Sequence, residues 1–518
     1  MRAATGRIAG AAALIAVLTV ASRLAGFART GVFTWLLAET RLGDIYVAAN
    51  TVPNIVFEIV AGGALASLVV PLLAGAVERG DRAAVSATAS ALLTWTLTLL
   101  VPLAALVALL AGPIVTGLAP QADPAQLAAG ERMLRVFAPQ LPLYGIGIVL
   151  TGVLQAHRRF AWPVLAPLLS SVTVIGAYLL FGVLEGRRAD VPAVGRAGEL
   201  VLSVGTTLGV VVLSLCLLVP VSRLGLRLRP AYRFAPDTRR AVGGLAVAGA
   251  VTVGAQQVAL VIALRLVLGG PEGGAVVFQL AQTIYLLPWA VLAVPLATAA
   301  YPALAAARAA DDPDRYQRTL ARATRGVVLL SCLGAAALVA VAGPVARFFD
   351  VPGAADGIAG FAPGLLGYGL FAVLTRALYA HGAPGPAAAA TAAGWLCAAC
   401  AALGLAAGLA DDQRVLAITL GNSVGMTVLG ALLVAVVVRR AGRAALAGLP
   451  RAALAGVLAG GAAAGAGWLV TRWTGTPGDG GAVLQGMLSG VAVGVVFLAV
   501  AYPLDRHDLR ALVGRRAR

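Results

Sequence analysis

Two arginines in an otherwise apolar segment are the residues of this sequence best suited to binding an anion. Arg23 and Arg29 lie within "IAGAAALIAVLTVASRLAGFARTGVFTWLL", residues 8–37, which is long enough to cross a membrane as a helix. A charged side chain at the centre of such a helix costs about 2.5–3.5 kcal/mol on insertion scales. The planar guanidinium group matches the oxygens of a phosphate or diphosphate. The pair therefore indicates a site for a phosphate-bearing substrate.

The spacing of the two arginines limits how they could be neutralised. Six residues apart, they are offset by roughly 120° around a helix and by about 9 Å along it, so one carboxylate could not easily serve both. Gly26 between them would let another helix or a substrate approach closely. Asp44 could hold one arginine in position or exchange with the substrate for it. Burial of the pair against Asp44 or Glu58 for packing alone is the structural alternative.

Three further polar residues lie in apolar segments. Asn54 and Glu58, in "PNIVFEIVAGG" (53–63), are one helical turn apart and are expected to share a face. Glu58 could act as a counter-ion or as a proton or cation site. Arg376 lies in an apolar segment far along the chain. Ionisable residues within membrane spans are functional candidates by default.

The elements that must position these residues are membrane helices. The 518 residues are 60% hydrophobic and 12% charged, whereas soluble domains carry about 25% charged residues. Apolar runs of membrane-spanning length recur along the chain. We predict an all-α polytopic membrane protein with fourteen transmembrane helices, at 9–37, 44–77, 84–112, 131–156, 161–184, 198–222, 241–268, 274–306, 320–344, 358–381, 385–409, 413–438, 449–471 and 482–503.

The distribution of arginine predicts the orientation of these helices. Clusters of arginine fall in alternate loops, at 223–240, 308–325 and 439–451, and in the tail 506–518. Because short arginine-rich loops stay in the cytoplasm, both termini are predicted to be cytoplasmic. The net charge of +17 then reflects membrane topology, and we expect no nucleic-acid partner.

An internal repeat divides the chain into two halves. "YGIGIVLTGVLQAH" (144–157) and "YGLFAVLTRALYAH" (368–381) share Tyr, Gly, Val, Leu, Thr, Ala and His at one constant offset. Six helices in each half make the repeats parallel, and two such lobes are expected to enclose the cleft of an alternating-access transporter. We predict pseudo-symmetric six-helix lobes at 1–222 and 241–440, a basic cytoplasmic linker at 223–240, and two further helices with a basic tail at 441–518.

No motif of an enzyme is present in the sequence. A P-loop, a zinc-protease motif and the spacing of a Ser-His-Asp triad are all missing. Cys397 and Cys400 form a CxxC pattern, but it lies within a predicted span and is interpreted as packing. We therefore expect a transporter without catalytic residues, cofactor or metal site, driven by the membrane potential or a cation gradient.

Two segments resemble the MurJ/MviN lipid II flippases, a family within the superfamily of multidrug exporters and polysaccharide flippases. These segments are "SRLAGFAR" (22–29) and "GDIYVAANTVPNIVFEIVAGGALASLVVPLLA" (43–74). The positions that fit the family pattern are Ser22, Arg23, Gly26, Phe27, Arg29, Asp44, Pro53, Asn54, Gly63, Ala64 and Pro71. Five of them are assigned to hinges or to close helix approach, namely Ser22, Gly26, Pro53, Gly63 and Pro71.

The resemblance implies a substrate and a location. Lipid II, an undecaprenyl-diphosphate-linked disaccharide-pentapeptide, would move from the inner to the outer leaflet of the bacterial cytoplasmic membrane for peptidoglycan synthesis. The arginines would meet the diphosphate, and the last two helices would form a groove for the prenyl tail. Membrane lipids and cell-wall synthesis proteins are the other expected partners. The substrate-binding candidates are Arg23, Arg29, Asp44, Asn54, Glu58 and Arg376.

The sequence also departs from the family pattern. Arginine is common in the family where this sequence has Phe57, Glu58 and Thr283, and glutamate is common where it has Gly62. The cavity is therefore expected to be less cationic, and Arg376 could compensate. The seventh predicted helix holds Gln256 and Gln257 but no acid, which disfavours the sodium site of some relatives.

Three other functions are compatible with parts of the sequence. A flippase for another polyprenyl-diphosphate-linked glycan would use the same arginines. A drug or cation antiporter would need acids and aromatic residues in its cavity, and the paired arginines argue against it. A scaffold that retains the fold without transport would tolerate alanine at Arg23 and Arg29.

Overall fold

The computed structural model describes residues 2–60, 66–232, 243–475 and 478–506, and the side chains of 2–16, 60, 66–68, 71, 243–248 and 479 lie outside that description. The described chain is helical. Its helices are α1 (Arg2–Leu37), α2 (Arg41–Val60), α3 (Ala66–Glu78), α4 (Arg82–Leu109), α5 (Ala111–Leu118), α6 (Pro124–Phe137), α7 (Gln140–Ala156), α8 (Ala161–Glu185), α9 (Arg196–Leu215), α10 (Leu218–Ser222), α12 (Gly243–Leu268), α13 (Gly274–Pro288), η2 (Trp289–Ala293), α14 (Val294–Ala309), α15 (Pro313–Phe349), α16 (Gly353–Phe361), α17 (Gly364–Ala380), α18 (Pro384–Gly408), η3 (Asp411–Gln413), α19 (Arg414–Ala441), η4 (Arg443–Leu446), α20 (Leu449–Trp473) and α21 (Asp479–Leu504).

These helices confirm the predicted all-α membrane fold. Among the described residues, 11 helical stretches are long and apolar enough to cross a membrane, and the pair α16 and α17, bent by 44°, makes a twelfth. They coincide one for one with the twelve predicted spans from 84–112 onward. The first two predicted spans overlap α1 and the pair α2 and α3. The total of fourteen and the orientation of the termini stay predictions.

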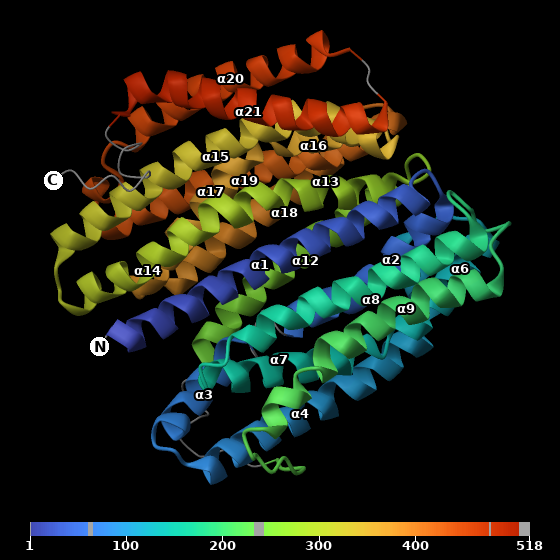
Figure 1. Cartoon of the computed structure of the whole chain (residues 1–518), viewed down its shortest axis with the longest axis horizontal. Helices are drawn as coiled ribbons and strands as arrows, with labels where there is room; N and C mark the ends of the chain where they lie inside the picture. Colours follow the sequence, from blue (N-terminus) through green and yellow to red (C-terminus); the bar gives the residue numbers. More distant parts are fainter. Residues whose placement is uncertain (1, 61–65, 233–242, 476–477, 507–518) are drawn as a thin grey trace. The chain divides into compact units, whose positions relative to one another are not determined.

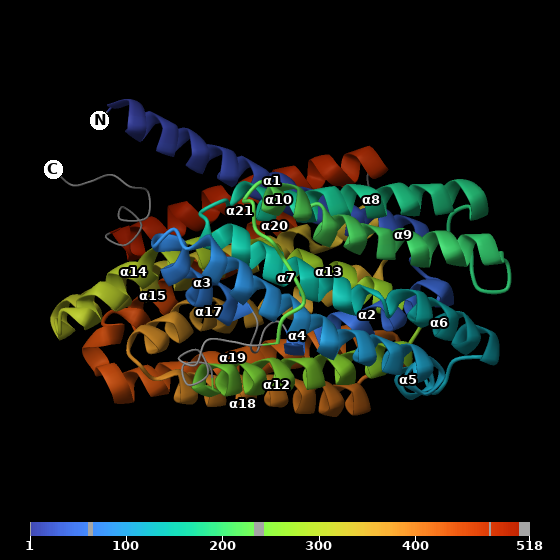
Figure 2. The same ribbon diagram turned by 90° about the horizontal axis from the view of Figure 1, so that it is seen from below.

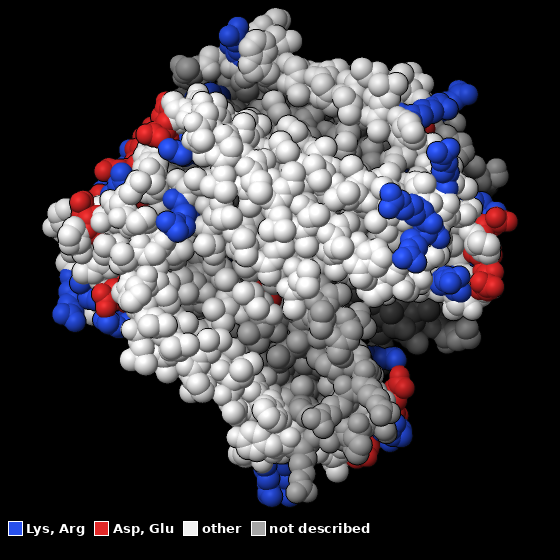
Figure 3. All heavy atoms as spheres, turned by 180° about the vertical axis from the view of Figure 1, so that it is seen from behind, with Lys and Arg blue, Asp and Glu red and all other residues white. Residues whose placement is uncertain are grey.

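The surface agrees with a chain that lies mostly in lipid. Large apolar side chains such as Leu109, Val183 and Trp473 are exposed. Figure 3 shows a face that is mostly uncharged, with the charged side chains gathered toward its margins. An exposed apolar surface of this kind is expected where lipid, not water, is the solvent.

The chain divides into two compact units, residues 1–257 and 258–518. The proposed domain limits at 222, 240 and 440 stay predictions. Packed helix pairs of unit 1 recur in unit 2. The pairs α3 with α7 and α4 with α7 correspond to α14 with α17 and α15 with α17. The pairs α7 with α9 and α8 with α9 correspond to α17 with α19 and α18 with α19. Figures 1 and 2 allow these neighbours to be followed. The internal repeat is therefore a repeat of tertiary structure.

The two predicted spans 131–156 and 358–381 are each broken near their start. A Phe-Ala-Pro sequence ends α6 at Phe137 and α16 at Phe361, and proline precedes α7 and α17. Proline removes a backbone donor and disfavours helix in the residue before it. The repeat therefore begins earlier in each half than the quoted segments indicate.

A hydroxyl on the facing helix satisfies the carbonyl left free at each break. Thr207 of α9 donates to the Val136 oxygen at 3.0 Å. Ser423 of α19 donates to the Gly360 oxygen at 2.7 Å and accepts from the Gly364 amide at 3.0 Å. In a membrane a freed carbonyl needs such a partner because lipid offers none. A hydroxyl-to-carbonyl hydrogen bond from the facing helix thus stabilises both broken spans.

The helices after the second lobe pack within unit 2. Both α20 and α21 lie against α15, as Figure 1 shows. Arg347 of α15 donates a hydrogen bond to Gln485 of α21, whose amide donates to the Thr471 oxygen of α20 at 2.9 Å. One polar cluster therefore joins the three helices.

Part of the predicted basic linker is bound to unit 1. The amides of Arg227, Arg229 and Ala231 donate to hydroxyls of Ser86, Ser90 and Thr94 at 2.8–3.0 Å. The three hydroxyls are four residues apart along α4, a rise of about 6 Å, and the three amides are two residues apart along an extended segment of about the same length. Each successive amide therefore meets the next hydroxyl. Residues 233–240 of the linker lie outside the described part.

Candidate functional site

Arg29 interacts electrostatically with three tyrosines of unit 1, whereas Arg23 is exposed. The Arg29 side chain is half-buried, and its charge acts on the hydroxyls of Tyr46, Tyr144 and Tyr178. These tyrosines come from α2, α7 and α8. The two arginines therefore occupy different environments, as their angular offset on the helix predicts.

The tyrosines beside Arg29 belong to a hydrogen-bonded cluster. The hydroxyl of Tyr46 lies 2.8 Å from that of Tyr178 and 2.6 Å from Thr206 Oγ1. The ring of Phe33 packs on both tyrosines, with centroids 4.9 and 5.2 Å away. This cluster joins α1, α2, α8 and α9. Sequence reasoning missed it, although Tyr46 follows Asp44 within the motif "GDIYVAAN".

Asn54 is linked to Tyr144, and Glu58 is not part of that link. Tyr144 donates its hydroxyl proton to Asn54 Oδ1 at 2.9 Å, and Asn54 Nδ2 donates to the Asn50 oxygen at 2.9 Å. The ring of Phe57 packs on Tyr144 with centroids 4.6 Å apart. Glu58 is exposed while Asn54 is half-buried. The structure thus brings Asn54 into the surroundings of Arg29 through Tyr144.

Asp44 is buried at the start of α2 and forms an ion pair within its own helix. Its carboxylate lies 3.9 Å from Arg41 Nη1. Only 3% of Asp44 is exposed, so a carboxylate in this position needs a cationic or hydrogen-bonding partner. Arg41 supplies such a cationic partner.

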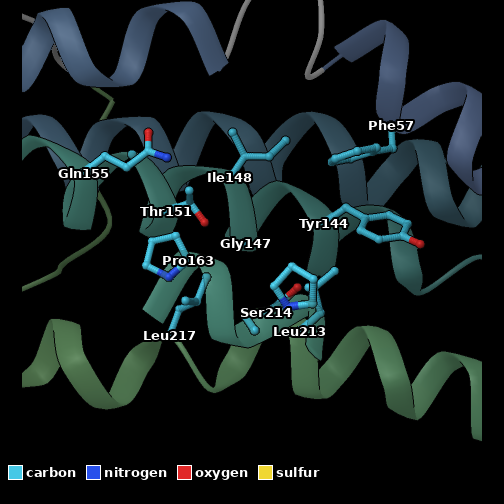
Figure 4. Close-up of a pocket in the computed structure, with 13 residues that line it drawn as sticks. Phe57, Tyr144, Gly147, Ile148, Thr151, Gln155, Pro163, Leu213, Ser214 and Leu217 are labelled. Carbon is cyan, nitrogen blue, oxygen red and sulfur yellow. The ribbon is translucent and has the colours of Figure 1, made fainter. Parts of the chain in front are cut away.

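A cavity of about 260 Å³ adjoins the Asn54–Tyr144 link within unit 1. Figure 4 shows Phe57 and Tyr144 at one end and Gln155 at the other. Thr151 and Ser214 are further polar groups in a mainly apolar lining, and Ser214 Oγ has no hydrogen-bond partner among the described residues. Such a cavity accepts a small, mostly apolar group with one or two polar atoms.

The candidates proposed as hinges lie in varied settings. Pro53 is inside α2, and Ser22 is half-buried on α1. A Cβ built on Gly26 meets no atom within 4 Å, so the described residues leave this side of α1 open. Gly63, like Gly62 and Ala64, lies outside the described residues, and so does the side chain of Pro71.

Arg376 belongs to unit 2. Its Nη1 donates to the Ala372 oxygen of its own helix at 2.6 Å, and its charge acts on Tyr301 and Tyr379. Thr283, at the position where the family commonly has arginine, donates to the Gln279 oxygen at 2.8 Å. Among the described residues no group of three His, Cys, Asp or Glu is arranged to hold a metal ion.

Comparison with known proteins gives one consistent family. The family model described as "Lipid II flippase MurJ" matches residues 33–481. The probable lipid II flippase MurJ of Rhizobium meliloti is 27% identical over 337 residues, covering 64% of this chain and 61% of the relative. The corresponding protein of Rickettsia prowazekii is 24% identical over 381 residues, covering 71% and 72%. The matched region thus spans less than two thirds of the Rhizobium relative.

Solved structures show the same fold. A lipid II flippase MurJ in an inward closed conformation superposes with a TM-score of 0.74 at 16% identity, covering 96% of this chain and 100% of that one. An inward-facing multidrug resistance MATE transporter of the MOP superfamily superposes with a TM-score of 0.65 at 14% identity, covering 83% and 98%. At these identities the likeness concerns the fold alone.

Proposed function

This chain belongs to the lipid II flippase MurJ family, and from that premise we propose that it moves lipid II from the inner to the outer leaflet of the bacterial cytoplasmic membrane. The observation that carries the proposal is the family match over residues 33–481. The recurring apolar helices agree with a multi-pass membrane protein. Arg23 and Arg29 precede the matched region.

Arg29 is the residue best placed to bind the diphosphate. A guanidinium can donate two parallel hydrogen bonds to phosphate oxygens, which strengthens binding and fixes its geometry. Its surrounding tyrosines, Tyr46 and Tyr178, are held by mutual hydrogen bonds. A positively charged group in an apolar helix lowers the cost of bringing a diphosphate into the membrane interior. Arg23, being exposed, is free to contact the same or an adjoining group.

Transport proceeds by alternating access in this proposal. The residues of α1 and α2 bind the diphosphate when open to the cytoplasmic leaflet and release it when open to the outer one. The prenyl tail stays in lipid beside α20 and α21, where Leu484, Leu488 and Val491 form part of an exposed apolar face. The membrane potential or a cation gradient supplies the energy, and cell-wall synthesis proteins bind the basic loops.

Lipid II on the outer leaflet of intact cells is the measurement that tests this function. Cells depleted of their own lipid II flippase would express the unaltered chain, Arg23→Ala, Arg29→Ala or the control Arg79→Ala, an exposed arginine at the end of α3. We expect the unaltered chain and the control to restore exposure. Each α1 variant should lower it by about tenfold or more at equal membrane levels, since a charged hydrogen bond is worth about 1.5–3 kcal/mol.

Two outcomes would contradict the proposal. Full exposure in the Arg23→Ala, Arg29→Ala double variant would remove the arginines from the mechanism. A chain present in the membrane at normal levels that restores no exposure would exclude lipid II as the substrate. A polyprenyl-diphosphate carrying another glycan would then be the substrate to assay.

A further inference from the structure

A second cavity lies at one end of unit 2, where three helices end and one begins. It measures about 250 Å³ and is lined by Ala307, Arg308, Asp312, Pro313, Tyr316, Gln317, His381, Arg440 and Ala441. These residues come from the ends of α14, α17 and α19 and from the start of α15. The volume is roughly that of eight water molecules and lies below the range of about 300–1,000 Å³ that encloses drug-sized ligands. It therefore suits a small polar group.

The charges lining this cavity are mainly positive. The lining holds two guanidinium groups, those of Arg308 and Arg440, and one carboxylate, that of Asp312, which already accepts the Arg315 amide at 2.8 Å as the cap of α15. Arg308 lies 3.5 Å from Asp311, but that pair is exposed, and exposed pairs contribute little. The cavity is therefore left with excess positive charge. The arginines also balance the helix C-termini on which they lie.

His381 also lines the cavity, and its imidazole lacks the hydrogen bond that its counterpart makes in unit 1. In the repeat of unit 1 the equivalent residue is His157, whose Nδ1 lies 2.8 Å from the carbonyl oxygen of Val153, four residues earlier. The carbonyl equivalent to Val153 in unit 2 is that of Ala377, and it accepts the hydroxyl of Tyr316 at 2.8 Å instead. The His381 backbone amide still donates to this oxygen at 2.9 Å, but the hydroxyl of Tyr316 takes the place that the imidazole has in unit 1. Nδ1 of His381 is buried without a hydrogen-bond partner among the described residues.

The surroundings of His381 favour its neutral form in the absence of a ligand. Burial and the charges of Arg308 and Arg440 lower the pKa of His381, although the Arg440 carbonyl opposes this. An anion in the cavity would reverse the balance, because it would compensate both guanidinium groups and stabilise the charged imidazole. Binding of an anion should therefore take up a proton.

We propose that this cavity of unit 2 is a phosphate-binding site, in which Arg308, Arg440 and His381 hold the phosphate of a free phosphate ion or of an anionic lipid headgroup. The tetrahedral group offers oxygens to two guanidinium forks and to the orphaned imidazole nitrogen. All the residues of this site belong to unit 2, and the proposal does not depend on lipid II as the substrate.

The test uses the purified full-length chain and two probes. Calorimetry with inorganic phosphate, in detergent free of lipid, measures binding of the free ion. Native mass spectrometry from nanodiscs of phosphatidylglycerol or phosphatidylcholine measures a retained anionic headgroup. The variants are Arg308→Gln, Arg440→Gln and Tyr316→Phe, and the matched control is Arg439→Gln, on the same helix turn as Arg440 but outside the cavity lining.

We expect one saturable site for one of the two probes. Arg308→Gln and Arg440→Gln should weaken binding by about tenfold or more, and Arg439→Gln should leave it unchanged. Tyr316→Phe keeps both arginines but frees the Ala377 carbonyl for His381, so it should weaken binding as well. Imidazole signals in nitrogen-15 spectra, assigned with His381→Gln, should show the pKa of His381 rising when the probe binds.

The two probes also identify the source of the phosphate. Binding of inorganic phosphate alone supports a soluble ligand, and retention of phosphatidylglycerol alone supports a lipid headgroup. Absence of saturable binding with both probes would overturn the proposal. Equal weakening by Arg439→Gln and Arg440→Gln would overturn it too, because the effect would then be general attraction by positive charge. Thermal unfolding of each variant shows whether lost binding reflects lost folding.

Discussion

At the scale of single residues, the decisive property of Arg29 is its neighbours. The position of an arginine in an apolar helix indicates function, but the hydroxyls of Tyr46, Tyr144 and Tyr178, on which its charge acts, come from three other helices. Asp44 and Asn54 illustrate the same dependence. Asp44 is paired with Arg41, and Asn54 is joined to Tyr144. Residue type alone does not reveal these pairings.

The pH dependence of stability reports on His381. Its pKa is lowered in the folded chain by burial and by Arg308 and Arg440, whereas the unfolded chain has the ordinary value of about 6.5. The unfolded state therefore binds more protons between the two values, and stability rises with pH in that window. On acidification from about pH 7.5 to about pH 5.5, which brackets the ordinary value, the folded chain should lose stability.

Thermal unfolding in phosphate-free buffer measures this loss, with His381→Gln as the reference variant. On acidification, the melting temperature of the unaltered chain should fall further than that of the variant. Phosphate in the buffer should reduce the difference, because a bound anion favours the protonated ring. An identical acid loss in the two proteins would show that His381 does not contribute.

At the scale of elements, close helix contacts depend on glycine. A Cβ on Gly367 of α17 would lie 1.9 Å from the Met426 backbone oxygen of α19. That oxygen belongs to the helix backbone and cannot rotate away as a flexible side chain can. On the same interface Ser423 joins the broken span to α19. The contact therefore fixes the packing of α16 and α17 on α19.

Alanine at Gly367 should consequently be strongly destabilising. The added methyl group would force α17 and α19 apart, at a cost of ~3 kcal/mol or more. The matched control is Gly404→Ala in α18, where an added Cβ meets nothing within 4 Å, and it should be neutral or slightly stabilising. Thermal unfolding in detergent compares the two. Equal melting temperatures would mean that the two helices can separate at little cost.

At the scale of the whole molecule, the repeat organises each unit but leaves the two halves chemically different. The same helix pairs and the same hydroxyl at the helix break occur in both. The arginine and tyrosine cluster is found in unit 1, and the second cavity in unit 2. One scaffold thus positions two different sets of polar residues.

The predicted membrane topology is tested at the same scale. With both termini cytoplasmic, alkaline phosphatase fused at Gln121, in the loop before α6, should be active outside the membrane. A fluorescent protein fused at Asp311, between α14 and α15, or at Arg518 should fluoresce in the cytoplasm. An active phosphatase at Arg518 would mean an odd number of spans, which would contradict fourteen.

The sequence by itself determines the all-α structure, the two related halves and the unusual position of two arginines. Hydrophobic runs of membrane length fix all-α structure, because in lipid each backbone group must be satisfied within its own segment. The offset between the repeated segments ending at His157 and His381 indicates two related halves. Arg23 and Arg29 are recognised as unusual because charge in a span is costly.

Only the tertiary structure decides which polar groups meet. Tyr144 and Asn54 are far apart in the chain, and so are Tyr316 and Ala377. Their pairing depends on how helices rotate and cross, and nearly uniform apolar sequences leave that rotation undetermined, because lipid and protein interior are equally apolar. The second cavity shows the same dependence. Tyr316 donates to the Ala377 carbonyl, whereas His157 contacts the equivalent carbonyl of Val153 in the other half, and this difference becomes visible only when the helices are packed.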